Sequence, residues 1–160
     1  MSAVTIREAT RDDAGVALSL LYELAEYEKL TDKFRLTREI IERDFIGPDA
    51  PCHCDLATVD GAPVGVMNWY RTYASFDASP GVFLEDIFVQ PKHRGKGIGK
   101  LFFVHLARHA LAIGATHIEW FVLDWNKPSI AFYERLGARQ PKEWLRYSLS
   151  GHALESLTKT

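Results

Sequence analysis

The sequence has few of the features that mark metalloproteins, disulfide-bonded proteins or membrane proteins. It contains two cysteines, Cys52 and Cys54, and no second cysteine pair that could complete a four-ligand zinc site. We therefore expect no bound metal and two reduced thiols. No apolar run approaches the length of a membrane span, and the first residues lack the basic and apolar segments of a signal peptide. These absences predict a cytoplasmic protein with no membrane partner.

A strong excess of charge of either sign is also missing. Lysine and arginine number 19, and aspartate and glutamate number 21, which gives a net charge of -2 at pH 7. So small a charge argues against an extended basic surface, and nucleic acid is not expected as a partner. The chain has 160 residues, of which 47% are hydrophobic, enough for one sizeable core. We predict a single domain spanning residues 1–160.

Hydrophobic patterns along the chain predict an α/β fold. Strands are predicted at Val4 to Glu8, His53 to Val59, Pro63 to Arg71, Val82 to Val89, Thr116 to Leu123 and Trp144 to Leu149. Helices are predicted at Thr10 to Lys29, just after Thr37, at Leu101 to Ile113 and from Pro128 until just before Gly137. Asp60 and Gly61 predict a hairpin turn, and Ala74 to Gly81 is expected to be a loop.

The most distinctive segment is a glycine-rich turn, His93 to Lys100, between a predicted strand and a predicted helix. Backbone N–H groups at the start of a helix have no intrahelical partner, so a turn with few side chains there lets phosphate oxygens approach closely. A nucleotide triphosphate loop would need Ser or Thr after its lysine, but Leu101 follows Lys100. A dinucleotide fingerprint would need glycine at position 100. The turn predicts a pyrophosphate site, with a glycine-rich turn that binds nothing as the alternative.

Two motifs together resemble a known family of enzymes. The first is Arg-x-x-Gly-x-Gly, formed by Arg94, Gly97 and Gly99, and the second is the segment Asp124 to Ala138 with its Asn, Pro, Ser, Phe-Tyr and Leu-Gly-Ala. They resemble the two signatures of the GCN5-related N-acetyltransferase (GNAT) family. The segments Leu24 to Leu30, Leu84 to Val89 and Leu123 to Asn126 look like its diamine (spermidine/spermine) and thialysine N-acetyltransferase branch. The resemblance spans nearly all of the chain.

This resemblance implies a fold and a reaction. The fold is the α/β GNAT acyl-CoA N-acyltransferase fold, a mixed central sheet flanked by helices. The reaction moves the acetyl group of acetyl-CoA, a cosubstrate, to a primary amine of a small polyamine, a diamine or a lysine-like amino acid such as thialysine. The amine attacks directly in a ternary complex, without a metal. Members of this branch are commonly homodimers, so a homodimer is expected.

The resemblance also assigns roles by position. Cofactor binding falls to Ile87, Phe88, Val89, Arg94, Gly95, Lys96, Gly97, Ile98, Gly99, Lys100, Asn126, Pro128 and Ser129. Backbone N–H groups of residues 87–89 would polarise the acetyl carbonyl. Tyr133 would lie near the cofactor sulfur and protonate the leaving thiolate. The alternative is that Tyr133 is an ordinary half-buried aromatic residue beside Phe132.

The substrate site is expected to be acidic. An alkyl ammonium has a pKa of about 10.4 and must lose a proton before it can attack. Glu85, at the end of a predicted strand, is the leading candidate for the base, and binding of the ammonium by the same carboxylate is an equal alternative. Asp86 should project from the opposite face unless the strand contains a bulge. Tyr27 and Glu28 are predicted to bind substrate, with a solvated helix face as the alternative.

Two other functions compete with this prediction. One is acetylation of a protein N-terminus or of a protein lysine, which would favour an open and shallow groove. The other is a non-catalytic module that binds acetyl-CoA without turnover. The presence of both Glu85 and Tyr133 argues against that module.

Overall fold

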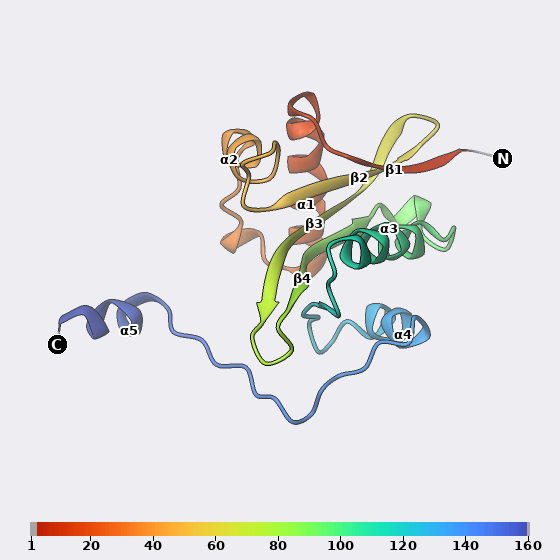
Figure 1. Cartoon of the computed structure of the whole chain (residues 1–160). Helices are drawn as coiled ribbons and strands as arrows, with labels where there is room; N and C mark the ends of the chain where they lie inside the picture. The colour runs from red at the N-terminus through yellow and green to blue at the C-terminus, as the bar shows by residue number, and fades with distance from the viewer. Residues whose placement is uncertain (1–2, 160) are drawn as a thin grey trace. The chain divides into compact units, whose positions relative to one another are not determined.

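The chain forms a five-stranded mixed sheet in a computed structural model that describes residues 3–159 (Figure 1). The strands are β1 (Val4–Glu8), β2 (His53–Val59), β3 (Ala62–Ala74), β4 (Ser79–Val89) and β5 (Ile118–Glu119). They follow one another in chain order across the sheet. The first three pairs are antiparallel and the last pair is parallel, which confirms the predicted mixed sheet.

The longer helices are α1 (Ala14–Glu28), α2 (Arg38–Asp44), α3 (Ile98–Ala112), α4 (Lys127–Arg135) and α5 (Gly151–Ser156). Contacts divide the chain into two compact units, one ending at Leu123 and the other beginning at Asp124. The first unit contains the sheet with α1, α2 and α3, and the second contains α4 and α5. Between residues 3 and 159, no helix is both long enough and apolar enough to cross a membrane.

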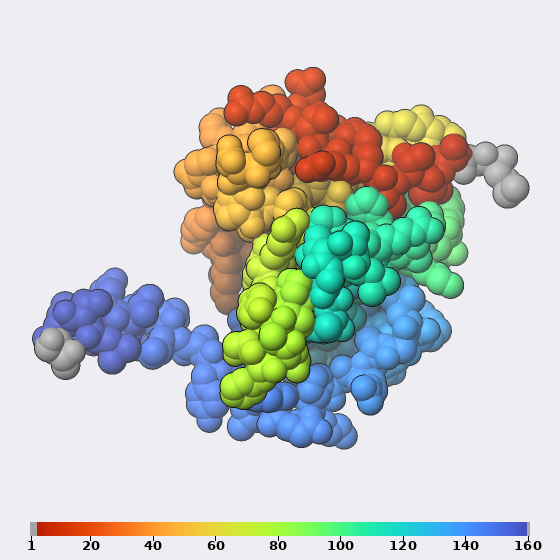
Figure 2. Space-filling model, viewed as in Figure 1, coloured from red at the N-terminus to blue at the C-terminus, as the bar shows by residue number. Residues whose placement is uncertain are grey.

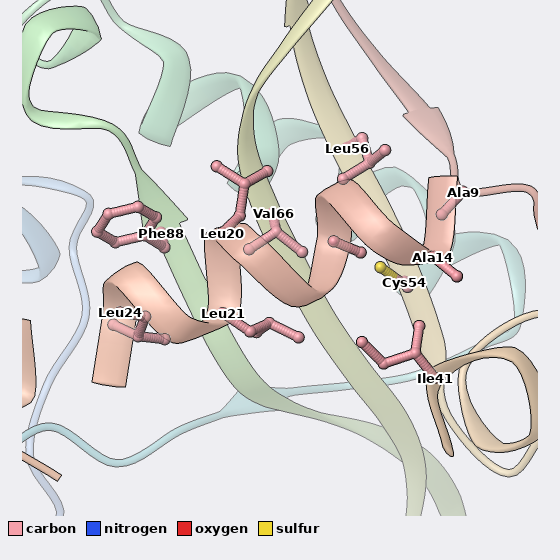
Figure 3. Packing of buried hydrophobic residues seen from close by; sticks show 11 residues of the cluster. Ala9, Ala14, Leu20, Leu21, Leu24, Ile41, Cys54, Leu56, Val66 and Phe88 are labelled. Atoms are coloured by element: carbon pink, nitrogen blue, oxygen red, sulfur yellow. The ribbon is translucent and has the colours of Figure 1, made fainter. Parts of the chain in front are cut away.

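One face of the sheet packs against α1. Leu20 and Leu24 of this helix lie in a buried cluster with Leu56 of β2, Val66 of β3 and Phe88 of β4 (Figure 3). The spacing of the apolar positions along α1 matches one face of a helix, as the sequence predicts. Thr37 caps α2 by accepting a hydrogen bond from the backbone N–H of residue 40, and that helix closes the same core.

The opposite face packs against α3. Phe102 and Leu106 of α3 are fully buried against Met67 and Trp69 of β3 and Leu84 of β4. Figure 2 shows the hairpin of β3 and β4, in yellow-green, beside this helix, in teal. The turn at residues 90–97 joins β4 to α3, and α3 leads to β5, so this part is the predicted βαβ unit with parallel strands.

Three predictions of secondary structure are wrong. The segment Ala74 to Gly81 is not a loop, because β3 and β4 extend into it and leave only residues 75–78 as a turn. The strand predicted at Thr116 to Leu123 is reduced to Ile118–Glu119. Residues 144–149 form no strand, although their side chains alternate as a strand's would. A strand needs a neighbour to complete its hydrogen bonds, and a pattern in one segment cannot supply that neighbour.

Candidate active site

A β-bulge in β4 lies at the centre of the candidate site. Trp69 of β3 pairs with Leu84, and Asn68 pairs with Asp86, so Glu85 is the extra residue without a partner on β3. A bulge re-aims the side chains next to it. Glu85 and Asp86 could serve one site only if the strand contained a bulge, and the strand contains one.

The second edge of β4 is open beyond the bulge. Within residues 3–159, β5 pairs with β4 only at Val82 and Phe83. From Leu84 to Val89 this edge of β4 has no strand beside it among those residues. Backbone groups along such an edge can hydrogen-bond to an extended ligand, as an added strand would. Ile87 and Val89, predicted to contact the cofactor, lie on this stretch, whereas the Phe88 side chain is buried in the α1 core.

The glycine-rich turn presents the start of α3 to solvent. Gly95 and Gly97 have φ angles of 73° and 81°, which L side chains rarely adopt, so glycine is needed there. Gly97 is the N-cap of α3, no side chain caps the helix, and its first turn carries no acidic residue. The positive end of this helix of 15 residues can therefore bind an anion. Ile98, Gly99 and Lys100 form its first turn.

Basic side chains surround this turn without acidic partners. Lys92, Lys96 and Lys100 are exposed, and none of them forms an ion pair in the part of the chain that the structure describes. Nearby lysines and burial lower the pKa of His93, with burial the larger cause. An anion bound here would meet positive charge and open backbone N–H groups together. The residues present thus fit a pyrophosphate group.

Arg94 connects this turn to the end of α1. Its Nε donates to the backbone oxygen of Val89 at 2.8 Å. Its guanidinium lies 4.9 Å from the centre of the Tyr27 ring and 5.5 Å from that of Phe88. The predicted substrate residue Tyr27 and the predicted cofactor residue Arg94 are therefore in contact, which the sequence did not indicate. The guanidinium is positioned by cation–π contacts that stabilise the end of α1 against the turn.

Acidic groups gather where α1 ends beside the bulge. Burial raises the pKa of Glu28. Burial also raises the pKa of Asp86 to about 6, the Asn68 amide opposes the shift, and the charges of Glu85 and Glu28 add to it. The Cys52 thiol has a raised pKa for a similar reason, burial first and then the charges of nearby carboxylates that include Glu85 and Asp86. This end of the sheet can attract a cation.

Asp86 and Asn68 are the residues that sequence reasoning missed. In a regular strand Asp86 would project away from the site, and the sequence predicts no role for Asn68. The structure joins them by a hydrogen bond of 3.1 Å from Asn68 Nδ2 to Asp86 Oδ2. A polar residue in an otherwise apolar run, Val64 to Trp69, is the only signal that the sequence offered for Asn68.

The remaining predicted residues belong to the second unit. Asn126 caps α4 by accepting a hydrogen bond from the Ser129 backbone N–H at 3.4 Å, and Pro128 occupies the first turn. Tyr133 is half-buried, with its ring 5.5 Å from that of Phe132. This geometry agrees with the predicted helix. The parts that these residues play in binding and catalysis are proposals.

Between residues 3 and 159, no group of three or more His, Cys, Asp or Glu side chains could hold a metal ion. Cys54 is buried and Cys52 half-buried, and both are free thiols.

Comparison with known proteins identifies similar acetyltransferases. Residues 16–138 match the model of the acetyltransferase (GNAT) family. The chain is 36% identical to thialysine N-epsilon-acetyltransferases of Sus scrofa and Bos taurus, over 98% of each protein. It is also 40% identical to an L-ornithine N5-acetyltransferase of Arabidopsis thaliana, over 62% of this chain and 44% of that protein.

Solved structures share the fold. An integron cassette protein from the mobile metagenome of V. cholerae matches with a TM-score of 0.82 and 22% identity, over 98% of both chains. A ribosomal-protein-alanine N-acetyltransferase from Brucella melitensis matches with a TM-score of 0.71 and 22% identity, over 93% of this chain and 100% of that one. The family match covers most of the chain, and the thialysine N-epsilon-acetyltransferases match nearly all of it. The chain therefore belongs to the acetyltransferase (GNAT) family, as an acetyl-CoA-dependent N-acetyltransferase.

Proposed function

We propose that this protein acetylates a primary amine of a small polyamine, a diamine or a lysine-like amino acid such as thialysine. The observation that carries the proposal is the bulge at Glu85, which brings carboxylates together beside the open edge of β4. The names of the relatives, thialysine N-epsilon-acetyltransferase and L-ornithine N5-acetyltransferase, support a small amine that carries a second charged group. The match of the family model to residues 16–138, on both sides of the boundary at 123, supports one catalytic domain.

Acetyl-CoA would lie along the open edge of β4, with its pyrophosphate at the start of α3. The N–H groups of Gly95 to Lys100 and the surrounding basic side chains suit the phosphates. The backbone between Ile87 and Val89 would hydrogen-bond to the pantetheine arm and polarise the acetyl carbonyl. Asn126, Pro128 and Ser129 would line the far side of the cofactor, as the resemblance implies.

The amine must reach the acetyl carbon without its extra proton. Glu85 would attract the ammonium and accept a proton from it, directly or through water. Glu28 and Tyr27, at the end of α1, would contact the rest of the substrate, because a diamine stays cationic at its distal end. The neutral amine then attacks the carbonyl in a ternary complex. No covalent acyl-enzyme is needed, which suits a raised pKa for both Cys52 and Cys54.

Tyr133 would complete the transfer. As the tetrahedral species collapses, the thiolate leaves and needs a proton, which the Tyr133 hydroxyl would supply. Its place in the middle of α4, next to Phe132, would fix the direction of the ring.

We expect the active protein to be a cytoplasmic homodimer. Trp144 and Tyr147 are 80% and 88% exposed, and large exposed aromatic residues are typical of surfaces that bind another protein. The alternation of apolar residues at 144–149 suits a strand that pairs with a second copy. Sedimentation of the wild type should give a dimer, and Trp144→Ser with Tyr147→Ser should give a monomer. A monomeric wild type would contradict this expectation.

The test of the function is release of free thiol from acetyl-CoA with a panel of amines. The panel contains spermidine, spermine, putrescine, thialysine, lysine and peptides with free N-termini. We expect turnover on a small amine, and a loss of about 100-fold in kcat for Tyr133→Phe. Tyr22→Phe, on the outer surface of α1, is the matched control and should keep wild-type activity.

Each of the other outcomes has a defined meaning. Turnover on peptides alone would identify a protein N-terminal or lysine acetyltransferase. Binding of acetyl-CoA with no thiol release on any amine would identify a non-catalytic module. Equal activity of Tyr133→Phe and wild type would remove Tyr133 from the mechanism.

A further inference from the structure

A pair of polar side chains lies on the α1 face of the sheet, next to Glu85. Asn68 and Asp86 face each other across β3 and β4, and the next residue in the same row is Cys54 on β2. Asn68 is 0% exposed and Cys54 is 1% exposed. The neighbouring positions on this face, such as Val66 and Phe88, are apolar. A carboxyl group in these surroundings is costly, whereas an apolar residue would not be.

The charged groups around Asp86 do not compensate its charge. Glu85 precedes Asp86 on the same strand, and Glu28 lies at the end of α1; both carry the same charge as an ionised Asp86. From β3 it receives only the neutral Asn68 amide, and the Cys52 thiol lies on the side of β2. Among residues 3–159, no basic side chain forms an ion pair with Asp86. Burial accordingly raises the pKa of Asp86 to about 6. This carboxyl group can change its protonation state near neutral pH.

Asn68 suits both states of that carboxyl group. Its Nδ2 donates to the ionised carboxylate, and its buried Oδ1 has no hydrogen-bond partner. A half-turn of the amide would present Oδ1 to a protonated Asp86, which has an O–H to donate. An apolar residue at position 68 could serve neither state, and an aspartate could not donate to the ionised one.

We propose that Asp86, held by Asn68, takes up the proton that the amine substrate gives to Glu85. The inference rests on the proposed acetylation of an amine. One N–H bond of the ammonium breaks, its electron pair stays on nitrogen, and the proton bonds first to a carboxylate oxygen of Glu85. The proton then passes to Asp86, and Glu85 is again an anion beside the reacting amine. The bulge makes this step geometrically reasonable, because in a regular strand the two carboxyl groups would lie on opposite faces.

Asp86 and Asn68 are thus positioning residues that act through Glu85, and their signature is a pH profile. Carbon-13 NMR of the resting protein follows the Asp86 carboxyl group directly, and the pH dependence of kcat/KM follows its effect on turnover. Both should show a midpoint near 6 in the wild type. In Asn68→Leu both midpoints should rise by roughly 0.5 to 1 pH unit, because the lost hydrogen bond favoured the ionised form. We expect kcat to fall while KM for the amine changes little.

Cys54→Ala is the matched control, since it is equally buried in the same row and should leave both midpoints unchanged. If Asn68→Leu does not fold, Asn68→Ser tests the same shift with a smaller side chain. An Asp86 midpoint at the ordinary value of about 4 in the wild type would overturn the inference. So would a wild-type rate profile that Asn68→Leu leaves unmoved. Absence of turnover on every amine would instead overturn the proposed function, and the inference with it.

Discussion

Two aspartates whose pKa values are raised by burial lie on opposite faces of the same sheet, and their surroundings differ. Asp55, on the α3 face, accepts a hydrogen bond of 2.7 Å from Trp69 Nε1, and His105 Nε2 lies 3.3 Å away. Asp86, on the α1 face, has one neutral amide and two carboxylate neighbours. Burial raises the pKa of both, although the partners of Asp55 oppose the shift. A well-partnered buried acid serves stability, whereas a poorly partnered one beside an open edge is typical of a functional site.

The largest loss of stability is expected when Asp55 loses its hydrogen bond from Trp69. Trp69→Phe keeps an aromatic ring against His53, which stacks on Trp69 at 4.0 Å, but removes the indole N–H. The Asp55 carboxylate then loses its shortest hydrogen bond inside the core. We expect a loss of about 3 kcal/mol in the free energy of unfolding, measured with urea.

Met67→Leu, a volume-conserving change on the same face, should lose less than about 1.5 kcal/mol. Equal losses for the two variants would mean that the hydrogen bond from Trp69 to Asp55 contributes nothing to the free energy of unfolding.

Asp86→Asn should raise the free energy of unfolding, whereas Trp69→Phe lowers it. The folded pKa of about 6 lies above the unfolded value of about 3.9, so the folded state binds the proton more tightly. The stability that this proton provides is present below pH 4 and is lost as the pH rises through 6. Asp86→Asn should therefore be about 2 to 3 kcal/mol more stable than wild type at pH 8 and equal to it at pH 4.

Urea unfolding at the two pH values measures this difference, with the exposed Asp77→Asn as control. A variant that is less stable than wild type at pH 8 would show that Asp86 is a structural acid, like Asp55.

Arg94→Lys tests whether the acidic end of α1 is held in place by the glycine-rich turn. Lysine keeps the positive charge but loses the planar group that lies over Tyr27 and Phe88. We expect a loss of about fivefold in kcat/KM for the amine, corresponding to about 1 kcal/mol. Arg108→Lys, an exposed change on α3, should be silent in the same assay. A loss that falls on acetyl-CoA alone would mean that Arg94 serves only the phosphates.

The smallest effect is expected at His105. Its side chain is 38% exposed, and Trp69 remains as a donor when it is removed. His105→Gln should cost less than about 1 kcal/mol in thermal or urea unfolding at pH 7. A cost as large as that of Trp69→Phe would show that His105 supports Asp55 as strongly as the indole does.

Local patterns predicted much of the fold because their causes are local. Asp60 and Gly61 both have positive φ, as a two-residue hairpin turn requires, and they join β2 to β3. The glycine turn, the start of α3 and the cap at Asn126 also follow from neighbouring residues. The βαβ unit followed from the order of these elements.

The features that sequence reasoning missed depend on pairing between strands. The run from Leu84 to Val89 reads as a regular strand, and only its register against Asn68 and Trp69 shows that Glu85 is an extra residue. The contact of Arg94 with Tyr27 joins segments far apart in the chain. The sequence therefore predicts Glu85 and Glu28 as members of the candidate site. That Asp86 lies beside them is visible only in the pairing of β3 with β4.

The most direct test of the account compares a diamine with a monoamine of the same length, cadaverine and pentylamine. The ratio of their kcat/KM values is measured for wild type, for Glu28→Gln and for Glu26→Gln, an exposed change on the same turn of α1. We predict that wild type and Glu26→Gln prefer the diamine, and that Glu28→Gln loses about tenfold of this preference. An unchanged preference in Glu28→Gln, or no preference in the wild type, would contradict an acidic amine site at the end of α1.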